Sequence, residues 1–269
     1  MDVLKAFLSY STRDKQLAGK IKERLSSWGV DVFMAHEDLV PSSEWQDEIV
    51  KNLSSCDVFI PILTGSYRLS DWTDQESGMA ISRSRVVVPL NITRNPHGFL
   101  GKYQACKINT SQLDQSCEDL VLALKNRREL RLRVQNSFIH SFVNSQGYLE
   151  ANTRSELLDR FGPYDESQIN EIIRGSLSND QVYGPTATRR RLRRFFSKNE
   201  RVIRKELRKR FPEQIPTDLS LEDTDNQVYD YVAKRHGEIS LSQASNDLGF
   251  SVDQVMGSTR RLKRKGLLA

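Results

Sequence analysis

The chain has 269 residues, which is room for roughly two domains that each hold a core. With 38% hydrophobic and 28% charged residues it has the composition of an ordinary globular protein, and no apolar run is long enough to span a membrane. The start, Met1 to Lys5, lacks the basic flank and long apolar core of a signal peptide. We therefore expect a cytoplasmic protein that does not enter a membrane.

The cysteines and histidines give no support to a metal site. Cys56, Cys106 and Cys117 are scattered and lack CxxC spacing, which excludes a zinc ribbon and fits a reducing compartment. The four histidines are equally scattered, so we expect no metal-binding residues.

The net charge of +5 is unevenly spread along the chain. Residues 1–116 hold 13 Lys or Arg and 14 Asp or Glu, whereas the remaining residues hold 27 and 21. The densest stretch, residues 189–210, contains 12 basic residues against Glu200 and Glu206. Such a density suits the neutralisation of phosphates, but a solvated helix face has the same pattern, and both interpretations stay open.

The first third of the chain alternates short β-rich runs with amphipathic helices, which predicts a parallel sheet covered on both faces. The expected strands are residues 3–9, 30–33, 58–63, 86–90 and, more weakly, 106–108. Apolar residues at helical spacing predict helices between them, marked by Leu17 to Trp28, by Trp45 to Leu53, by Ser70 or Thr73 to about Arg85, and by Ser116 to about Arg128. Gly29 is expected to end the first helix.

In a sheet of this kind, ligands bind at the carboxyl ends of the strands. The loops to inspect are therefore residues 9–14, 34–44 and 64–71, which follow the first three strands. Glu76 lies just beyond the third of these loops.

Glu76 is a carboxylate in the inward-facing stripe of the third helix, because Trp72, Glu76 and Ala80 share one face at helical spacing. An unpaired buried carboxylate costs several kcal/mol by order of magnitude, and a cleft for chemistry would explain one there. The alternative is structural: Thr73 is the N-cap and Glu76 the third helical residue of a capping box.

Residues 126–222 predict Arg-rich helices broken at Gly162-Pro163, at Gly184-Pro185 and between Pro212 and Pro216, and they contain no catalytic constellation. Residues 223–269 predict a helix over Val228, Tyr231 and Val232, a second helix from Leu241 to Leu248, and a third from Val252 to Lys265, after a turn at Gly249. This part resembles a helix-turn-helix unit of the winged type, with Ser245 as the small residue for close packing and Val255, Thr259 and Leu262 on the inner face.

The resemblance is incomplete, since no full wing fits before Ala269. Asp253 and Gln254 lead the third helix and offer few donors to base edges, whereas its cations gather toward its end. This distribution favours phosphate contact over sequence recognition, and docking of a protein is equally open.

Five boxes of residues follow one another along the first part of the chain. They are Phe7-Leu8-Ser9-Tyr10-Ser11-Thr12-Arg13-Asp14, then Val32-Phe33-Met34, then the loop from His36 to Ser43 leading into Trp45, then the strand from Asp57 to Leu63 with Thr64-Gly65-Ser66, and finally Ser70-Asp71-Trp72 with Glu76. Taken together, they resemble the boxes of Toll/interleukin-1 receptor (TIR) domains. The resemblance covers residues 1–125 and implies an α/β domain with a flavodoxin-like parallel five-stranded sheet. An all-α remainder would follow, made of a connecting region, 126–222, and the helix-turn-helix, 223–269.

The Trp-x-x-x-Glu spacing resembles that of TIR domains that hydrolyse NAD rather than serve as adaptors. It implies that Glu76 is the catalytic residue of an NAD hydrolase or cyclase, with NAD as substrate and no resident cofactor. The resemblance places the substrate-binding residues in the same boxes: Ser9, Tyr10, Ser11, Phe33 and Trp72. Packing accounts equally well for Tyr10 and Trp72.

The resemblance also implies self-association, because in this family the loop after the second strand, here residues 36–43, gates the site and contacts neighbouring TIR domains. We expect an antiviral defence or signalling role in which the basic C-terminal half receives a trigger, either a nucleic acid or a partner protein. The alternative is a non-enzymatic TIR adaptor with a docking or nucleic-acid-binding tail. A phosphoacceptor receiver domain does not fit, because Tyr10-Ser11 and Thr64-Gly65 stand where its acids would be.

Overall fold

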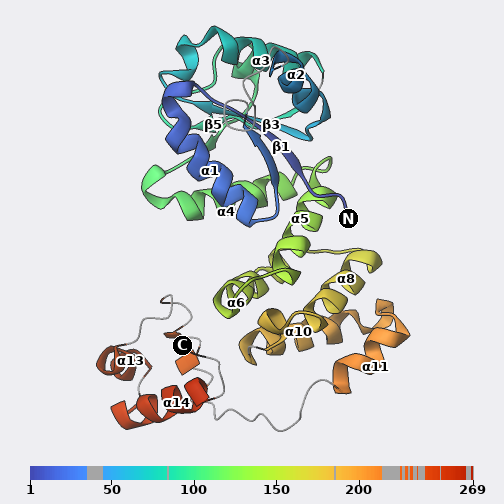
Figure 1. The fold of residues 1–269 in the computed structure, drawn as a ribbon, viewed down its shortest axis with the longest axis vertical. Coiled ribbons are helices and arrows are strands. Elements are labelled where there is room, and N and C mark those ends of the chain that lie inside the picture. The colour runs from blue at the N-terminus through green and yellow to red at the C-terminus, as the bar shows by residue number, and fades with distance from the viewer. Residues whose placement is uncertain are drawn as a thin grey trace. The chain divides into compact units, whose positions relative to one another are not determined.

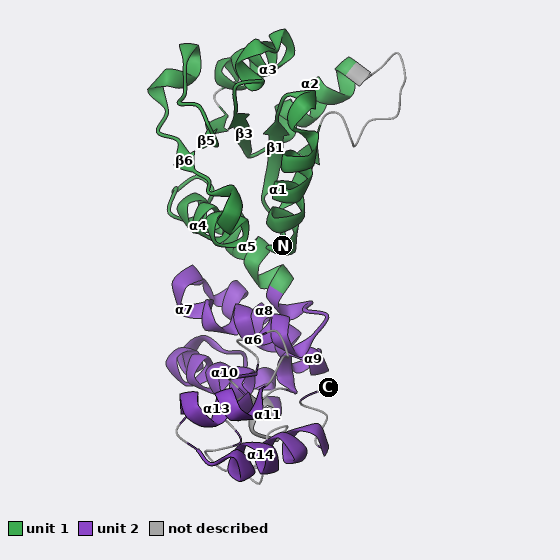
Figure 2. Cartoon of the chain, turned by 90° about the vertical axis from the view of Figure 1, so that its left-hand side faces the viewer, with its two compact units in different colours: residues 1–141 green, residues 142–269 purple. Residues whose placement is uncertain are grey.

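The computed structural model describes residues 1–34, 45–83, 85–184 and 186–213, and then residues 225, 228–229, 231–232, 235, 240–248, 250–264 and 268. The chain divides into two compact units, Met1–Ser141 and Phe142–Ala269, which Figure 2 shows in different colours.

The first unit contains a parallel sheet with the strand order β2-β1-β3-β5-β6, and β4 also pairs with β3. Its strands are β1 Lys5–Ser9, β2 Asp31–Met34, β3 Val58–Leu63, β4 Val86–Val87, β5 Leu90–Asn91 and β6 Cys106–Lys107. The predicted α/β class with a parallel sheet is confirmed. The expected strand at 86–90 is instead two short pieces, β4 and β5, with Pro89 between them. Proline has no N–H to give to the ladder, which explains the break.

Helices cover both faces of the sheet (Figure 1). One face carries α2 Trp45–Ser55 and α3 Asp71–Ser82, whose Leu53 and Ala80 pack on Phe7 and Phe59 of the strands. On the other side lie α1 Lys15–Ser27 and α4 Leu113–Lys125, which pack against each other. Because all strands run parallel, their carboxyl ends meet at one edge and their amino ends at the other.

The helix α5, Arg131–Val143, is bound to the amino-terminal edge of the sheet by hydrogen bonds and an ion pair. The Ser137 hydroxyl accepts from the Leu4 backbone N–H at 2.9 Å, Asn136 donates to the Asp2 carbonyl at 3.0 Å, and Arg133 pairs with Asp57. The boundary expected at residue 125 leaves this helix in the connecting region, whereas these contacts hold its first part in the first unit, which extends to Ser141. The sequence pattern marks the helix but does not show what it packs on.

The second unit is helical in its described residues. Its elements up to residue 213 are α6 Tyr148–Glu156, α7 Leu158–Phe161, α8 Glu166–Leu177, α9 Asp180–Tyr183, α10 Thr186–Asn199, the short 3-10 helix η5 Glu200–Val202 and α11 Lys205–Glu213. Breaks occur at Gly162-Pro163 and near Gly184 as expected, and α11 ends at Glu213, within the range from Pro212 to Pro216 where a break was expected. None of the helices in the described part of the chain has the length and apolar character of a membrane span.

The C-terminal helices share a small apolar core. α13 Leu241–Leu248 contributes Ala244, and α14 Val252–Arg264 contributes Val255 and Leu262, all fully buried with Val228. The Ser245 hydroxyl donates to the Phe250 carbonyl at 2.6 Å. The expected second and third helices are therefore present; Gly249 and residues 265–267 lie outside the described residues, and the helix-turn-helix assignment stays a prediction.

Gly29 is the glycine on which the junction between α1, β2 and α5 depends. It follows α1 with a φ of 77°, and a Cβ atom there would lie 2.2 Å from the Ser137 carbonyl oxygen. We predict that Gly29→Ala lowers the free energy of unfolding by about 2 kcal/mol or more, because the variant combines left-handed backbone strain with a backbone clash.

Gly78→Ala is the matched control for this prediction, since it lies inside α3 and a Cβ there meets nothing within 4 Å. Helix propensity predicts a gain of up to about 1 kcal/mol. Urea denaturation of both variants measures the difference, and equal stabilities would contradict the account of Gly29.

Candidate active site

The candidate site lies where β1 ends beneath α3. Side chains alternate along a strand, so Ser9 leaves β1 on the same face as Phe7, the face that α3 covers. Glu76, in the second turn of α3, turns toward this strand end. The Ser9 hydroxyl donates a hydrogen bond of 2.5 Å to Glu76 Oε2. Strand alternation and helical spacing therefore bring the two side chains together from opposite directions.

The Ser9–Glu76 bond is the end of a chain of buried hydroxyl groups. The Tyr67 hydroxyl lies 3.0 Å from Ser9 Oγ and 3.0 Å from Ser77 Oγ. A serine hydroxyl has one hydrogen, and that of Ser9 points to Glu76, so Ser9 accepts from Tyr67 and Tyr67 accepts from Ser77. Tyr67 is fully buried and Ser9 and Ser77 nearly so. This chain of hydroxyl groups thus fixes the direction of the Ser9 hydroxyl toward the carboxylate.

The loops after β1 and β3 are joined at the same edge of the sheet. Thr64, directly after β3, donates from its hydroxyl to Asp14 Oδ2 at 2.6 Å and accepts from the Tyr67 backbone N–H at 3.0 Å. These bonds hold the 3-10 helix η2, Tyr67–Leu69, in place. The position of the Tyr67 ring is therefore set by its backbone as well as by its hydroxyl.

The capping-box interpretation of Glu76 is wrong. Helix α3 begins at Asp71 with Ser70 as its N-cap, so Thr73 lies inside the helix. The Thr73 hydroxyl donates to the carbonyls of Tyr67 and Ser70, at 2.8 Å each. Glu76 meets the Ser9 hydroxyl instead of capping a helix end.

Glu76 is held in an environment that disfavours its charge. Only 3% of the residue is exposed, and its Oε1 atom has no hydrogen-bond partner in the described part of the chain. Burial raises the pKa of Glu76 to about 7, and the neighbouring Ser9 and Trp72 side chains oppose the rise. A carboxyl group with this pKa changes charge near neutral pH, which is the range in which enzymes use acids and bases.

The other expected binding residues differ in how far their side chains are buried. Tyr10 and Ser11 continue from Ser9 and are buried, with exposures of 2% and 5%. Trp72 is partly buried, one turn before Glu76, and packs against the apolar cluster that includes Tyr67. These positions place Ser9 and Trp72 beside the carboxyl group, and the assignment of all of them to substrate binding stays a prediction.

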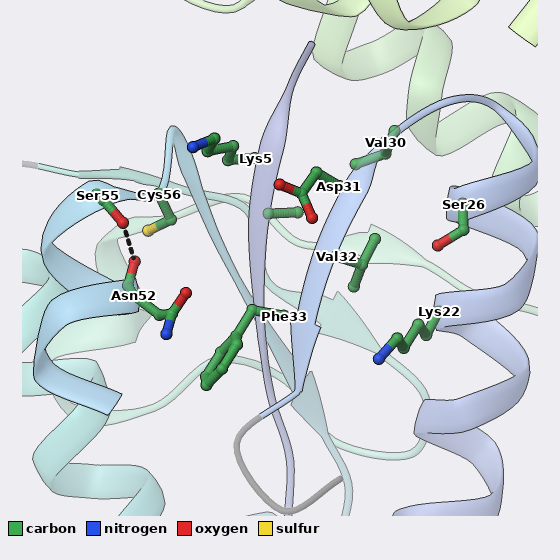
Figure 3. Close-up of a pocket in the computed structure, with 11 residues that line it drawn as sticks. Lys5, Lys22, Ser26, Val30, Asp31, Val32, Phe33, Asn52, Ser55 and Cys56 are labelled. Carbon is green, nitrogen blue, oxygen red and sulfur yellow. Dashed lines mark hydrogen bonds between the residues drawn. The ribbon is translucent and has the colours of Figure 1, made fainter. Parts of the chain in front are cut away.

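Phe33 lies on the edge strand β2, next to β1, which carries Ser9. Its ring packs on Phe7, with 5.2 Å between ring centroids, and it lines a cavity of about 440 Å³ beside the edge strand β2 (Figure 3). Lys22 of α1 and Asn52 of α2 line opposite sides of this cavity. Glu76 is absent from its described lining. Phe33 also packs against the apolar cluster that includes Tyr67, so its part in substrate binding stays a prediction.

Tyr67 and Ser77 are the site residues that the sequence analysis did not single out. Tyr67 lies in the loop after the third strand, which the sheet rule had marked for inspection. Ser77 lies beside Glu76 in sequence and offers no pattern of its own. The loop at residues 36–43, expected to gate the site, lies outside the described residues. In the residues that are described, no cluster of three or more His, Cys, Asp or Glu side chains is arranged to hold a metal ion.

Comparison with known families identifies a domain in the first unit. Residues 6–121 match the model of the TIR domain, a span that runs from β1 into α4 and includes Ser9, Tyr67 and Glu76. No curated protein matches the chain. The first unit therefore carries a TIR domain.

The raised pKa has a consequence for stability. An acid whose pKa is about 7 in the folded state and 4.5 when unfolded favours folding most below pH 4.5, and that contribution is lost as pH rises through 7. We predict that Glu76→Gln, which keeps the shape without the charge, is more stable than wild type by about 3 kcal/mol at pH 8. The difference should shrink toward pH 5. Thermal unfolding of both proteins across this range measures it, and a pH-independent difference would contradict a buried, raised carboxyl group.

Proposed function

We propose that the TIR domain cleaves the nicotinamide–ribose bond of NAD, with Glu76 as the catalytic carboxylate. The supporting observation is the buried Glu76 carboxyl group, which is directed by Ser9 and keeps one oxygen without a partner in the described residues. TIR domains include NAD-cleaving enzymes as well as adaptors. Among these two classes, a carboxyl group raised to a pKa of about 7 at the carboxyl edge of the sheet favours the enzyme.

The reaction needs little beyond one carboxylate. When the N-glycosidic bond breaks, its electron pair leaves with nicotinamide, which becomes neutral and needs no acid. The ribose carbon becomes an oxocarbenium-like cation, which Glu76 stabilises by charge, captures as an ester, or positions through the ribose hydroxyls. Water then adds to that carbon and releases a proton, which gives ADP-ribose; attack by a nucleophile within the same molecule, with loss of its proton, instead gives a cyclic isomer.

The burial of Glu76 supports a proposal in which activity depends on assembly. Because the residue is only 3% exposed, NAD reaches it after the neighbouring side chains rearrange. TIR domains commonly self-associate. We propose that contact between copies opens the site, and that the basic C-terminal half receives the trigger in a defence or signalling role.

A non-enzymatic interaction module is the second candidate, and the burial of Glu76 is the observation that favours it. In that case the carboxyl group is a structural member of the hydroxyl chain. The two candidates differ in one measurable property, which is turnover of NAD.

We predict that the assembled wild-type protein releases nicotinamide from NAD and that Glu76→Ala lowers the rate by about 100-fold or more. The rate should fall as pH decreases through 7, because the protonated carboxyl group no longer stabilises the cation. Chromatography of nicotinamide and the ribosyl product, at low and high protein concentration, measures both effects.

Glu129→Gln is the matched control, since Glu129 is exposed and lies between α4 and α5. It should retain the wild-type rate. If the wild type releases no nicotinamide at high concentration with added oligonucleotide or cell extract, the enzymatic proposal fails and the interaction module remains.

A further inference from the structure

Helix α10 of the second unit has side chains on three distinct faces. One face is apolar and faces inward: Leu192 is fully buried and Phe195 is 6% exposed, next to the buried Thr188. This face fixes the rotation of the helix, and with it the direction of every charged side chain that α10 carries.

The second face carries cations that already have partners. Arg191 donates to Glu156 at 2.7 Å and to Asn152 at 2.6 Å, and Lys198 pairs with Asp159 at 2.9 Å. These partners belong to α6 and α7 or adjoin them. Where a carboxylate lies within reach, this fold therefore uses it to neutralise a cation of α10.

The third face carries Arg190, Arg193 and Arg194, all exposed. No hydrogen bond or ion pair joins these three guanidinium groups to any described residue. Like charges three and four residues apart on a helix repel one another and destabilise it. The pKa of the neighbouring Arg189 is lowered, mainly by burial and to a smaller extent by the Arg193 charge.

The third face also borders a hollow. A cavity of about 200 Å³ is lined by Ala187, Arg190, Arg191 and Arg194, with no carboxylate in its described lining. Its position beside α10 brings the guanidinium groups of Arg190 and Arg194 to the same space. Arg194 also lines a neighbouring pocket with Glu156 and Asp159, whose carboxylates are paired with Arg191 and Lys198.

We propose that this face of α10 binds the phosphodiester backbone of a nucleic acid. A guanidinium group donates two parallel hydrogen bonds to a phosphate, which makes arginine the preferred residue for such contacts. Arg190 and Arg194 are one helical turn apart, and Arg201 and Arg204 continue as exposed cations beyond the helix. Three exposed arginines spaced along one helix match a ligand whose charge repeats, not a single phosphate.

The chemistry of the face also indicates how the ligand is recognised. Its three cations are arginines, Phe195 of the same helix is buried, and Phe196 is half-buried. Contact with phosphates alone gives binding that depends on salt and not on sequence. This binding is independent of the proposed NAD cleavage, and its test requires no enzymatic activity.

The test is fluorescence anisotropy of the full chain with a labelled DNA duplex and, separately, a labelled single-stranded RNA, over a series of salt concentrations. The variant Arg190→Gln/Arg193→Gln/Arg194→Gln should bind more than about tenfold more weakly at moderate salt. It should also lower the slope of log affinity against log salt by about 3, one for each lost phosphate contact. The two probes show whether DNA, RNA or both supply the backbone.

Two further variants separate charge from geometry. Lys20→Gln/Arg68→Gln/Lys107→Gln removes the same charge from exposed positions of the first unit and should bind as the wild type does. Replacing the three arginines by lysine should keep the salt slope but weaken binding, because lysine contacts a phosphate as a point charge. Circular dichroism checks that each variant is folded.

Three results would overturn the proposal. They are no binding of either probe by the wild type, equal binding by the wild type and the arginine-to-glutamine variant, and an equal loss in the first-unit control. Displacement of the probes by polyglutamate at matched charge would also overturn it, in favour of an acidic protein partner.

Discussion

The hydrogen bond from Ser9 to Glu76 is the interaction on which the candidate site depends. Taking a carboxylate out of water costs several kcal/mol, and one serine hydroxyl offsets part of that cost. The rest remains as a raised pKa, so Glu76 is poised between its charged and neutral forms near pH 7. Tyr67 and Ser77 keep the Ser9 hydroxyl directed at the carboxyl group. The chain of hydroxyl groups therefore holds a carboxyl group whose charged form the surrounding core disfavours.

The two edges of the parallel sheet have different roles in the first unit: one is packed against helices, and the other carries the polar residues of the candidate site. At its amino-terminal edge, Gly29 and Ser137 bring α1 and α5 into backbone contact, and this end is closed by packing. At the carboxyl edge the loops after β1 and β3 meet, and the polar residues gather there. A domain arranged in this way can tolerate a buried carboxyl group with a raised pKa at one end because the other end supplies stability.

Much of this arrangement follows from periodicity, and the remainder depends on contacts that periodicity does not specify. Helical spacing placed Glu76 on the inward face, and β-rich runs located the sheet. The bond between Ser9 and Glu76 joins residues far apart in sequence, so it needs the position of α3 over β1. For the same reason the sequence does not indicate Tyr67, and it allows Thr73 as a helix cap although the Thr73 hydroxyl donates to two carbonyls. The cavity that Phe33 lines could not be foreseen from its strand box.

Direct titration of the Glu76 carboxyl group tests this account most directly. Carbon-13 NMR of glutamate-labelled protein, with the Glu76→Gln variant to assign the signal, gives the pKa without need of a substrate or a trigger. The account predicts a midpoint of about 7 that rises further in Ser9→Ala, because that variant removes the hydrogen bond to the charged form. A midpoint near 4.5, unchanged in Ser9→Ala, would contradict it, since it would mean that Glu76 is solvated and not held by Ser9.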